Sequence, residues 1–348
     1  MSRRTRWLVV LVWCILLVVP LPISAGAAGD PLRRLHVADG SKTLGQIARA
    51  YRVPLRDLAL INGLVPGEPL APGLRLRLPV SSAAVGSIVG VVMTPTVPGQ
   101  GETLVFQVTT NAPVRLTAYF DDAAVAVDAR GLGLAGVHPV AAPGEHLLRV
   151  RATDAEGWVT EAIWPVRVVA RPFDEQHIVL SDETSALLAP ELVQAERRKL
   201  AAIWERAEGI ALWTGPFTYP LTIPLRLTTG FGTRRTYNDG QLYGFHEGVD
   251  YGALAGTPVY ATASGRIVLA EPLAVRGNAV IVDHGMGVVS GYWHLSRIGV
   301  EAGQVVRQGD LLGWVGTTGL STGPHLHWEV RIVGIPVDPR PWVERGFP

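Results

Sequence analysis

Residues 323–330, Gly-Pro-His-Leu-His-Trp-Glu-Val, constrain the fold of this 348-residue chain more than any other stretch. Its alternating character continues through Arg-Ile-Val and is typical of a β-strand. Residues two apart on a strand point to the same face, so His325 and His327 face one space. The stretch therefore predicts a sheet that carries either a metal or acid/base site or a chance pair of histidines on a solvated strand.

A histidine and an aspartate four residues apart, His246 and Asp250, lie upstream in the segment 245–252. Glycines in and beside this segment argue against a helix, so we expect an extended segment with both side chains on one face. Neutral imidazole and carboxylate are both zinc ligands, and three such ligands with a fourth position open make a catalytic site. His294 adds a further histidine in a strand-like run.

Eight short motifs follow one another in order over about residues 217–340. They are Phe231-Gly232-Thr233-Arg234, His246-x-x-x-Asp250, Gly256-Thr257-Pro258-Val259, Gly277-Asn278, Asp283-His284-Gly285, Tyr292-x-His294-Leu295, Gly303-x-x-Val306-x-x-Gly309 and Thr322-Gly323-Pro324-His325-Leu326-His327. Together they closely resemble the lysostaphin-type (LytM-like) zinc metallopeptidases, which cut peptidoglycan cross-links. We expect an antiparallel β-fold with the zinc set in a groove on one sheet.

Carried over residue by residue, the resemblance makes His246, Asp250 and His327 the ligands of one zinc ion per chain. It makes His325 and His294 catalytic histidines that do not bind the metal. Zinc polarises the scissile carbonyl and lowers the pKa of its bound water towards about 7. We expect His325 to act as the general base and His294 to stabilise charge or donate a hydrogen bond, with the two roles open to exchange.

Other residues near the motifs receive supporting roles. Glu247 and Glu329 are candidate hydrogen-bond partners of the histidines, and His284 is expected to be structural, in an Asp-His-Gly turn. Two tyrosines, Tyr237 and Tyr243, either contact the substrate or pack against their own loop.

The region 217–348 reads as strand, turn and strand nearly throughout and is interpreted as the metallopeptidase domain. Loops 236–244 and 273–277 are expected to form the walls of its groove, because loops on a rigid scaffold commonly carry specificity. The predicted strands are residues 257–263, 265–270, 279–283, 288–294, 313–315 and 325–333.

The N-terminus indicates export to the cell envelope or the extracellular space. A basic segment, residues 2–6, precedes an apolar run over residues 7–19, and this pattern predicts a signal peptide over residues 1–27. The run is short for a bilayer span of about 20 residues. The alternative is an uncleaved anchor reaching Ile23, and only then is a membrane a partner. Cys14, the only cysteine, lies inside this run, so the mature chain has no thiolate metal ligand.

Composition narrows the classes of protein that remain. The length leaves room for two or three domains, each with its own core. A net charge of +1 gives no electrostatic footprint for nucleic acid. Charged residues are few, at 18%, whereas glycine and proline abound, which suits a β-rich protein with many turns.

Residues 30–80 predict a small β-α-α-β domain, with Thr43 capping one helix and Pro54 opening the next. This order, together with the motifs Thr-Leu-x-x-Ile-Ala at 43–48 and Asn-Gly-Leu at 62–64, resembles a LysM domain. The resemblance implies binding of N-acetylglucosamine-containing glycans such as peptidoglycan. The turn at 40–43 is one residue longer than usual in that family, and a packing or spacer module is the alternative.

Two connecting segments follow. Regular short β-patterned runs over residues 85–170 predict an immunoglobulin-like β-sandwich that acts as a spacer. Residues 171–216 predict a helical linker with its helix at 190–207. The linker is interpreted either as a connector that packs Trp204 and Trp213 against a neighbouring domain or as an arm that occludes the active groove.

The sequence thus predicts a mainly β protein that is a secreted, zinc-dependent endopeptidase. Its substrate is the peptide cross-link of peptidoglycan, and its LysM-like domain anchors it to the wall. The alternative is a non-catalytic wall-binding protein or amidase activator on the same fold. Among cross-links, the polar loop 236–244 favours one that joins D-alanine to a diamino acid over a glycine bridge.

Overall fold

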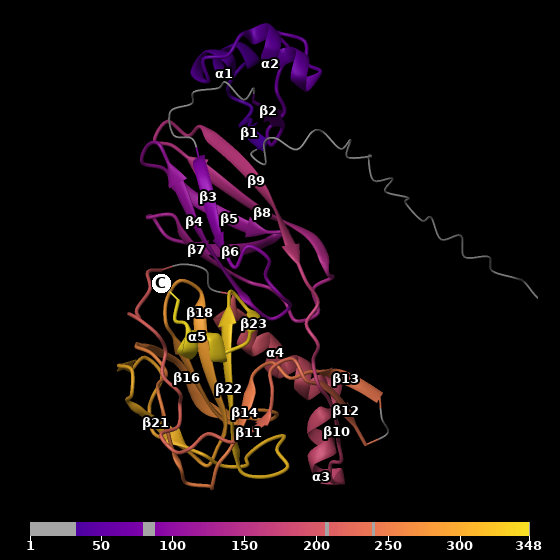
Figure 1. Ribbon diagram of the computed structural model, residues 1–348, viewed down its shortest axis with the longest axis vertical. Coiled ribbons are helices and arrows are strands. Elements are labelled where there is room, and N and C mark those ends of the chain that lie inside the picture. Colours follow the sequence, from indigo (N-terminus) through magenta and orange to yellow (C-terminus); the bar gives the residue numbers. More distant parts are fainter. Residues whose placement is uncertain (1–32, 79–87, 206–208, 239–240, 348) are drawn as a thin grey trace, which may run out of the picture. The chain divides into compact units, whose positions relative to one another are not determined.

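The computed structural model describes residues 33–78, 88–205, 209–238 and 241–347 (Figure 1). The predicted signal peptide, residues 1–27, lies outside the described residues. Strands dominate the described chain and pair antiparallel almost throughout, which confirms the predicted mainly β fold. No helix within these ranges is long and apolar enough to cross a membrane.

The N-terminal part has the predicted β-α-α-β order. The Thr43 hydroxyl accepts a hydrogen bond from the Gln46 N–H, and the Gln46 side chain reaches back to the Thr43 N–H, which forms a capping box. The second helix ends where Gly63 adopts φ +63°. The elements are β1 (Arg33–Val37), α1 (Leu44–Ala50), α2 (Leu55–Asn62) and β2 (Arg75–Arg77).

The next seven strands form a β-sandwich. Strands β3, β4 and β7 make one layer and β5, β8 and β9 the other, with β6 bridging the two, an immunoglobulin-like order. Side chains from both layers fill one core around Phe106 and Trp164. The strands are β3 (Ile88–Thr94), β4 (Thr103–Thr110), β5 (Arg115–Phe120), β6 (Ala123–Val127), β7 (Leu132–Gly136), β8 (Gly144–Thr153) and β9 (Val159–Val168).

Strand β1 also pairs with β9, so the sheet of the N-terminal part continues into the sandwich. The Tyr51 hydroxyl lies 3.0 Å from Nδ1 of His36 and 3.2 Å from the Thr160 hydroxyl. Backbone pairing and this buried polar group therefore join the two parts.

The segment after the sandwich contains a strand that the sequence did not predict. Strand β10 (Glu175–Ile178) pairs in parallel with β12, and α3 (Asp182–Ser185), a 3₁₀ turn η1 (Ala186–Leu188) and α4 (Pro190–Trp204) follow. Helix α4 begins at the predicted proline. The expected packing of Trp204 and Trp213 is confirmed, because both are buried in hydrophobic clusters with the C-terminal strands.

The C-terminal part is built on an eight-stranded sheet in the order β11-β14-β22-β18-β17-β16-β20, with β23 beside β22 (Figure 1). The part also contains two three-stranded sheets, β10-β12-β13 and β15-β21-β19. The elements are β11 (Leu227–Thr229), β12 (Arg234–Tyr237), β13 (Gln241–Phe245), β14 (Val249–Gly252), β15 (Pro258–Tyr260), β16 (Gly265–Leu273), β17 (Gly277–Asp283), β18 (Val288–Leu295), β19 (Arg297–Ile298), β20 (Val305–Val306), β21 (Leu311–Trp314), β22 (His325–Ile332), β23 (Ile335–Val337) and α5 (Arg340–Glu344).

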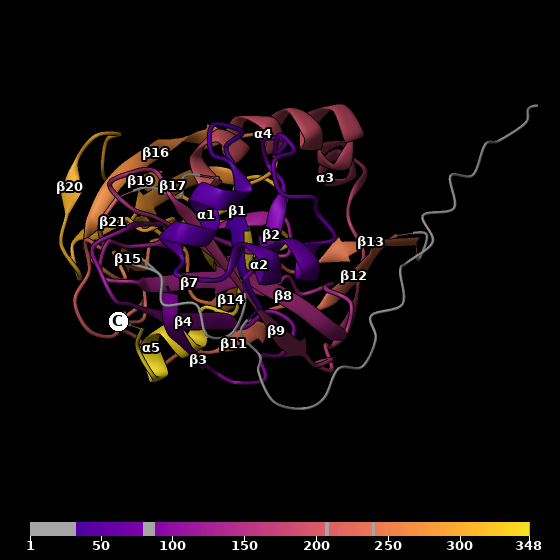
Figure 2. The same ribbon diagram turned by 90° about the horizontal axis from the view of Figure 1, so that it is seen from above.

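The central strands of this sheet are buried on both faces. Along β22, Leu326, Trp328 and Val330 point into the larger hydrophobic core, so His327 and its odd-numbered neighbours point to the other face. That second face also carries Trp293, which packs with residues of α4. Figure 2 shows α4 beside the strands of this sheet. The predicted histidine pair therefore lies on the face that α4 covers.

Candidate metal centre and active site

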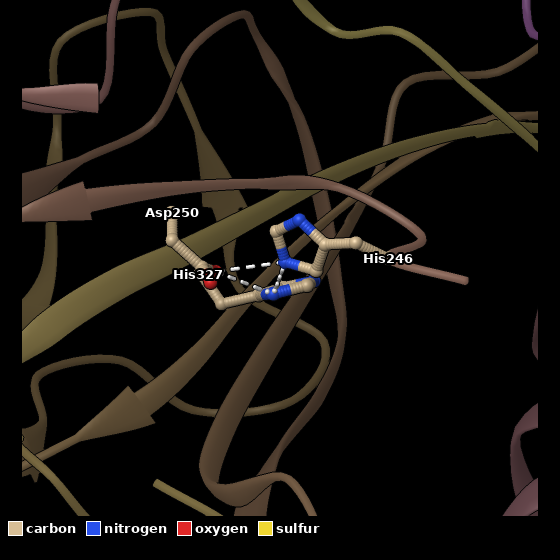
Figure 3. A group of neighbouring side chains, drawn as sticks. All are labelled: His246, Asp250 and His327. Atoms are coloured by element: carbon tan, nitrogen blue, oxygen red, sulfur yellow. Dashed lines mark hydrogen bonds and ion pairs between the residues drawn. The ribbon is translucent and has the colours of Figure 1, made fainter. Parts of the chain in front are cut away.

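Pairing of β14 with β22 places Asp250 directly opposite His327. His246 lies in the bend before β14, and all three side chains are buried. Nε2 of His246 is 2.9 Å from Oδ1 of Asp250 and 2.8 Å from Nδ1 of His327, and that Nδ1 is 2.9 Å from the same Oδ1 (Figure 3). The structure thus brings the three predicted metal ligands together at one point.

Hydrogen bonds on the far side of each ring fix which nitrogen faces this point. Nδ1 of His246 lies 2.9 Å from the Gly230 carbonyl. Since a carbonyl only accepts, Nδ1 carries the proton and Nε2 presents a lone pair. Nε2 of His327 donates to Oε1 of Glu329 at 3.0 Å, which leaves Nδ1 as the lone-pair nitrogen. Two ring lone pairs and a carboxylate oxygen therefore converge within 2.9 Å of one another.

The second oxygen of Asp250 accepts a hydrogen bond from Nη2 of Arg235 at 2.8 Å. Burial would raise the pKa of Asp250, but the charges and hydrogen bonds of His246 and His327 hold it well below its ordinary value. Burial lowers the pKa of His246 to about 4. For His327 burial acts in the same direction, but hydrogen bonds to Asp250 and Glu329 outweigh it and raise the pKa.

Three converging acceptors repel one another unless a cation lies between them. The raised pKa of His327 reflects the same attraction of this point for positive charge. Two imidazoles and one carboxylate are also the donor set of a catalytic zinc site, which keeps a position open for water or substrate. The orienting bonds from the Gly230 carbonyl and Glu329 are of the kind that hold metal-binding histidines in place. The residues present therefore fit a zinc ion.

The two remaining predicted histidines lie beside this cluster. His325 opens β22, donates from Nδ1 to the Gly323 carbonyl at 2.8 Å, and places Nε2 3.7 Å from Oδ1 of Asp250. His294 donates from Nδ1 to the Thr318 carbonyl at 2.8 Å, and its ring centroid is 4.9 Å from that of His325. Burial and repulsion from the neighbouring histidines lower the pKa of His294 to about 3.

His294 has an unusual backbone conformation, with φ +61°. The register between β17 and β18 shifts beside it, so β18 carries an extra residue there. For a residue other than glycine, a backbone with positive φ costs about 1–3 kcal/mol of conformational energy. Residues strained in this way cluster at functional sites. The backbone N–H of His294 donates to the Arg276 carbonyl, which holds the strained conformation in place.

The supporting residues only partly follow the sequence-based predictions. Glu329 bonds directly to His327, as expected, whereas Glu247 bonds to Arg331 at 2.5 Å. Arg235, which holds Asp250, was missed, because a single arginine in a short strand gives no local signal. His284 is structural as predicted, since its ring is buried and hydrogen-bonded on both sides.

Two adjoining hollows, of about 170 and 450 Å³, run past the cluster. Both are bordered by Arg235, Tyr237, His294 and Leu320. The loop expected at 236–244 is largely a β-hairpin formed by β12 and β13. The side chain of Tyr243 lies outside the described residues.

Comparison with known proteins identifies two domains. Residues 244–339 match the family model of peptidase family M23, and residues 37–79 match that of the LysM domain. The chain is 42% identical over 125 residues to DD-carboxypeptidase/endopeptidase Mpg of Neisseria gonorrhoeae, and 38% identical over 120 residues to peptidoglycan DD-endopeptidase ShyA of Vibrio cholerae. These alignments cover 36% and 34% of this chain.

The chain spans less than a third of the length of these curated relatives, 29% and 28% respectively. Among solved structures, one assigned to peptidase M23 from Pseudomonas aeruginosa is similar over 73% of this chain and 97% of its own. The sequence identity is 26% and the TM-score is 0.50. That likeness extends well beyond the segment matched by the family model.

Proposed function

Since its C-terminal part is a peptidase family M23 domain and its N-terminal part carries a LysM domain, we propose that this chain is a zinc-dependent peptidoglycan endopeptidase. The single observation that supports this most is the convergence of three lone-pair ligand atoms from His246, Asp250 and His327. They lie beside two further histidines and open onto a hollow.

In the proposed mechanism His246, Asp250 and His327 hold the metal. When bound, zinc supplies polarisation of the scissile carbonyl and a more acidic water. His325 presents Nε2 on the same side of β22 as His327, and it accepts the proton from the attacking water. His294 stays neutral at its low pKa, so it orients the nucleophile by accepting a hydrogen bond at Nε2.

This assignment refines the role of His294 that the sequence suggested. Its Nδ1 proton is already committed to the Thr318 carbonyl, so the neutral ring has no second proton to offer to an oxyanion. His325 therefore takes the general-base role. After bond cleavage the protonated His325 returns the proton to the departing amine.

We further propose that the bond cut joins D-alanine to a diamino acid. Of the two relatives named above, one is described as a DD-carboxypeptidase/endopeptidase and the other as a peptidoglycan DD-endopeptidase, and their similarity to this chain supports the same bond class. A non-catalytic amidase activator is the weaker alternative, because the chain retains all three ligand positions and both additional histidines.

The LysM domain is proposed to hold the enzyme on peptidoglycan glycan, with the sandwich as spacer and residues 1–27 as the export signal. The similarity of residues 37–79 to LysM supports the glycan contact. Tethering to an insoluble substrate raises the local concentration of the active site without changing its chemistry.

Digestion of purified sacculi by the zinc-loaded and the chelator-treated protein tests the proposal. Mass spectrometry is expected to find cross-linked dimers converted to monomers only with zinc. Pentaglycine, offered in parallel, should stay intact. Unchanged dimers with both protein forms would support the non-catalytic alternative, and rapid cleavage of pentaglycine would refute the proposed bond.

A further inference from the structure

Helix α4 presents one continuous face to the C-terminal sheet. Val193, Glu196, Leu200 and Trp204 recur at steps of three or four residues, and Arg197 lies one turn from Val193. Leu200 and Trp204 pack with hydrophobic side chains of β16, β17 and β18 on the sheet face that carries the histidines. The first turns of α4 therefore extend from this contact towards the metal centre.

A buried ion pair fixes the helix at that point. Glu196 is 6% exposed, and its two oxygens accept hydrogen bonds from the Val275 N–H at 2.8 Å and from Nη1 of Arg276 at 2.9 Å. The guanidinium carbon of Arg331 lies 3.9 Å from the centre of the Trp204 ring. Because a buried carboxylate is costly to separate from its partners, α4 is a fixed part of the peptidase domain.

Residues on both sides of Glu196 in the sequence border the smaller hollow. Leu188, Val193 and Arg197 line it together with His246, His294 and His327. The hollow of about 170 Å³ between them means that α4 borders the active site and does not fill it. This geometry indicates that α4 forms a wall of the groove. It argues against the alternative from the sequence, in which the linker occludes the groove.

The charges that line this hollow are almost all neutralised by partners. Arg235 pairs with Asp250, Arg276 pairs with Glu196 and Glu247, and Glu329 pairs with Arg331. Arg197 is the exception, since no carboxylate of the described residues lies within ion-pair distance of it. A cation with no partner beside an active site is suited to an anion that arrives with the substrate.

We propose that Arg197 binds a carboxylate of the peptide substrate, which makes α4 a specificity-determining wall of the groove. This inference rests on the proposed function and narrows it. The ligand class is a peptide that carries a free carboxylate close to the scissile bond, as a diamino acid with a second carboxyl group does in a stem-peptide cross-link. A glycine bridge offers no such group, so Arg197 discriminates against it.

A matched pair of variants tests this role. Arg197→Gln removes the charge that borders the hollow, whereas Arg198→Gln removes an equally exposed charge on the same helix that does not line it. The substrates are a cross-linked muropeptide dimer with the free diamino-acid carboxylate and the same dimer with that carboxylate amidated.

Arg197→Gln is expected to lower kcat/KM for the free-acid dimer by about tenfold, mainly through KM, as for one lost charge-assisted hydrogen bond. It should leave the amidated dimer unaffected, and Arg198→Gln should change neither. An equal loss in both variants, or a loss in Arg197→Gln that persists on the amidated dimer, would overturn the inference.

Binding of the monomeric stem peptide to the zinc-loaded protein, measured by calorimetry, separates this inference from the proposed function. Arg197→Gln should weaken binding of the free acid about tenfold and that of the amidated peptide not at all. If the wild type cleaves no dimer, the proposed function fails. If wild type and variant bind the free acid equally, the role of Arg197 fails whether or not cleavage occurs.

Discussion

Replacing Glu329 with glutamine should weaken zinc binding without unfolding the protein. Both oxygens of Glu329 accept hydrogen bonds, from Nε2 of His327 at 3.0 Å and from Nε of Arg331 at 2.9 Å. Burial raises the pKa of Glu329, but the charge of Arg331 and the bond to His327 outweigh this and lower the pKa, so the side chain is an anion.

Glutamine keeps the shape of Glu329 but has one acceptor and one donor group. Whichever way its amide is turned, an N–H faces either His327 or Arg331, which are themselves donors. Loss of a partner that orients a metal-binding histidine typically costs 10–100-fold in affinity, or about 1.4–2.7 kcal/mol. Arg331 keeps its 2.5 Å bond to Glu247, so the fold should persist.

The assay is competition for zinc against a chromophoric chelator, with a thermal melt of the metal-free protein in parallel. Glu247→Gln is the matched control, because it removes a partner of Arg331 and leaves the bond between Glu329 and His327 intact. The reasoning predicts a zinc Kd raised 10–100-fold in Glu329→Gln and within about twofold of wild type in Glu247→Gln. Equal affinities in wild type and Glu329→Gln, or equal losses in both variants, would refute it.

Four further outcomes follow from the same geometry. Alanine at His246, Asp250 or His327 should each reduce bound zinc, measured by elemental analysis of the purified protein. His325→Ala should keep its zinc but hydrolyse dimers about 100-fold more slowly or worse, and wild-type turnover would exclude it as the base. Because its partners raise the pKa of His327, a proton occupies this ring below that pKa, so the zinc Kd measured by competition should rise as pH falls through it. Deletion of residues 30–80 should weaken co-sedimentation with peptidoglycan and leave cleavage of a small soluble peptide unchanged.

Local signals in the sequence predicted most of the elements that the structure contains. Thr43 and Gly63 mark helix ends through capping, which acts over three or four residues. Strand β4 lies within the predicted β-patterned region, and its buried and more exposed positions largely alternate. By contrast β7 gives no alternating signal, because all five of its residues are buried and its two glycines are weak strand formers.

The proximity of the three proposed metal ligands was predictable because two of the relevant spacings are short. His246 and Asp250 are four residues apart, and His325 and His327 are two apart, so the strand period alone pairs them. Asp250 on β14 lies opposite His327 on β22, and His327 is hydrogen-bonded to Glu329. No local pattern in the sequence sets the register between these two strands, so this pairing could be predicted only from the family resemblance.

The walls of the groove were not predictable in the same way. Glu196 and Arg276 are 80 residues apart and meet only because α4 packs on the sheet. Arg235 reaches Asp250 through a side chain whose position depends on the β12–β13 hairpin. Such contacts depend on tertiary packing, which hydrophobic periodicity does not encode.

The proposed chemistry and the proposed recognition come from different stretches of this chain. The family model covers residues 244–339, which hold the three proposed metal ligands and both additional histidines. Arg197 and Arg235 precede that segment yet border the same hollow as His294. In the proposed mechanism the ligand set can polarise any peptide carbonyl, so an exchange of α4 should change which peptide is held there and leave the chemistry the same.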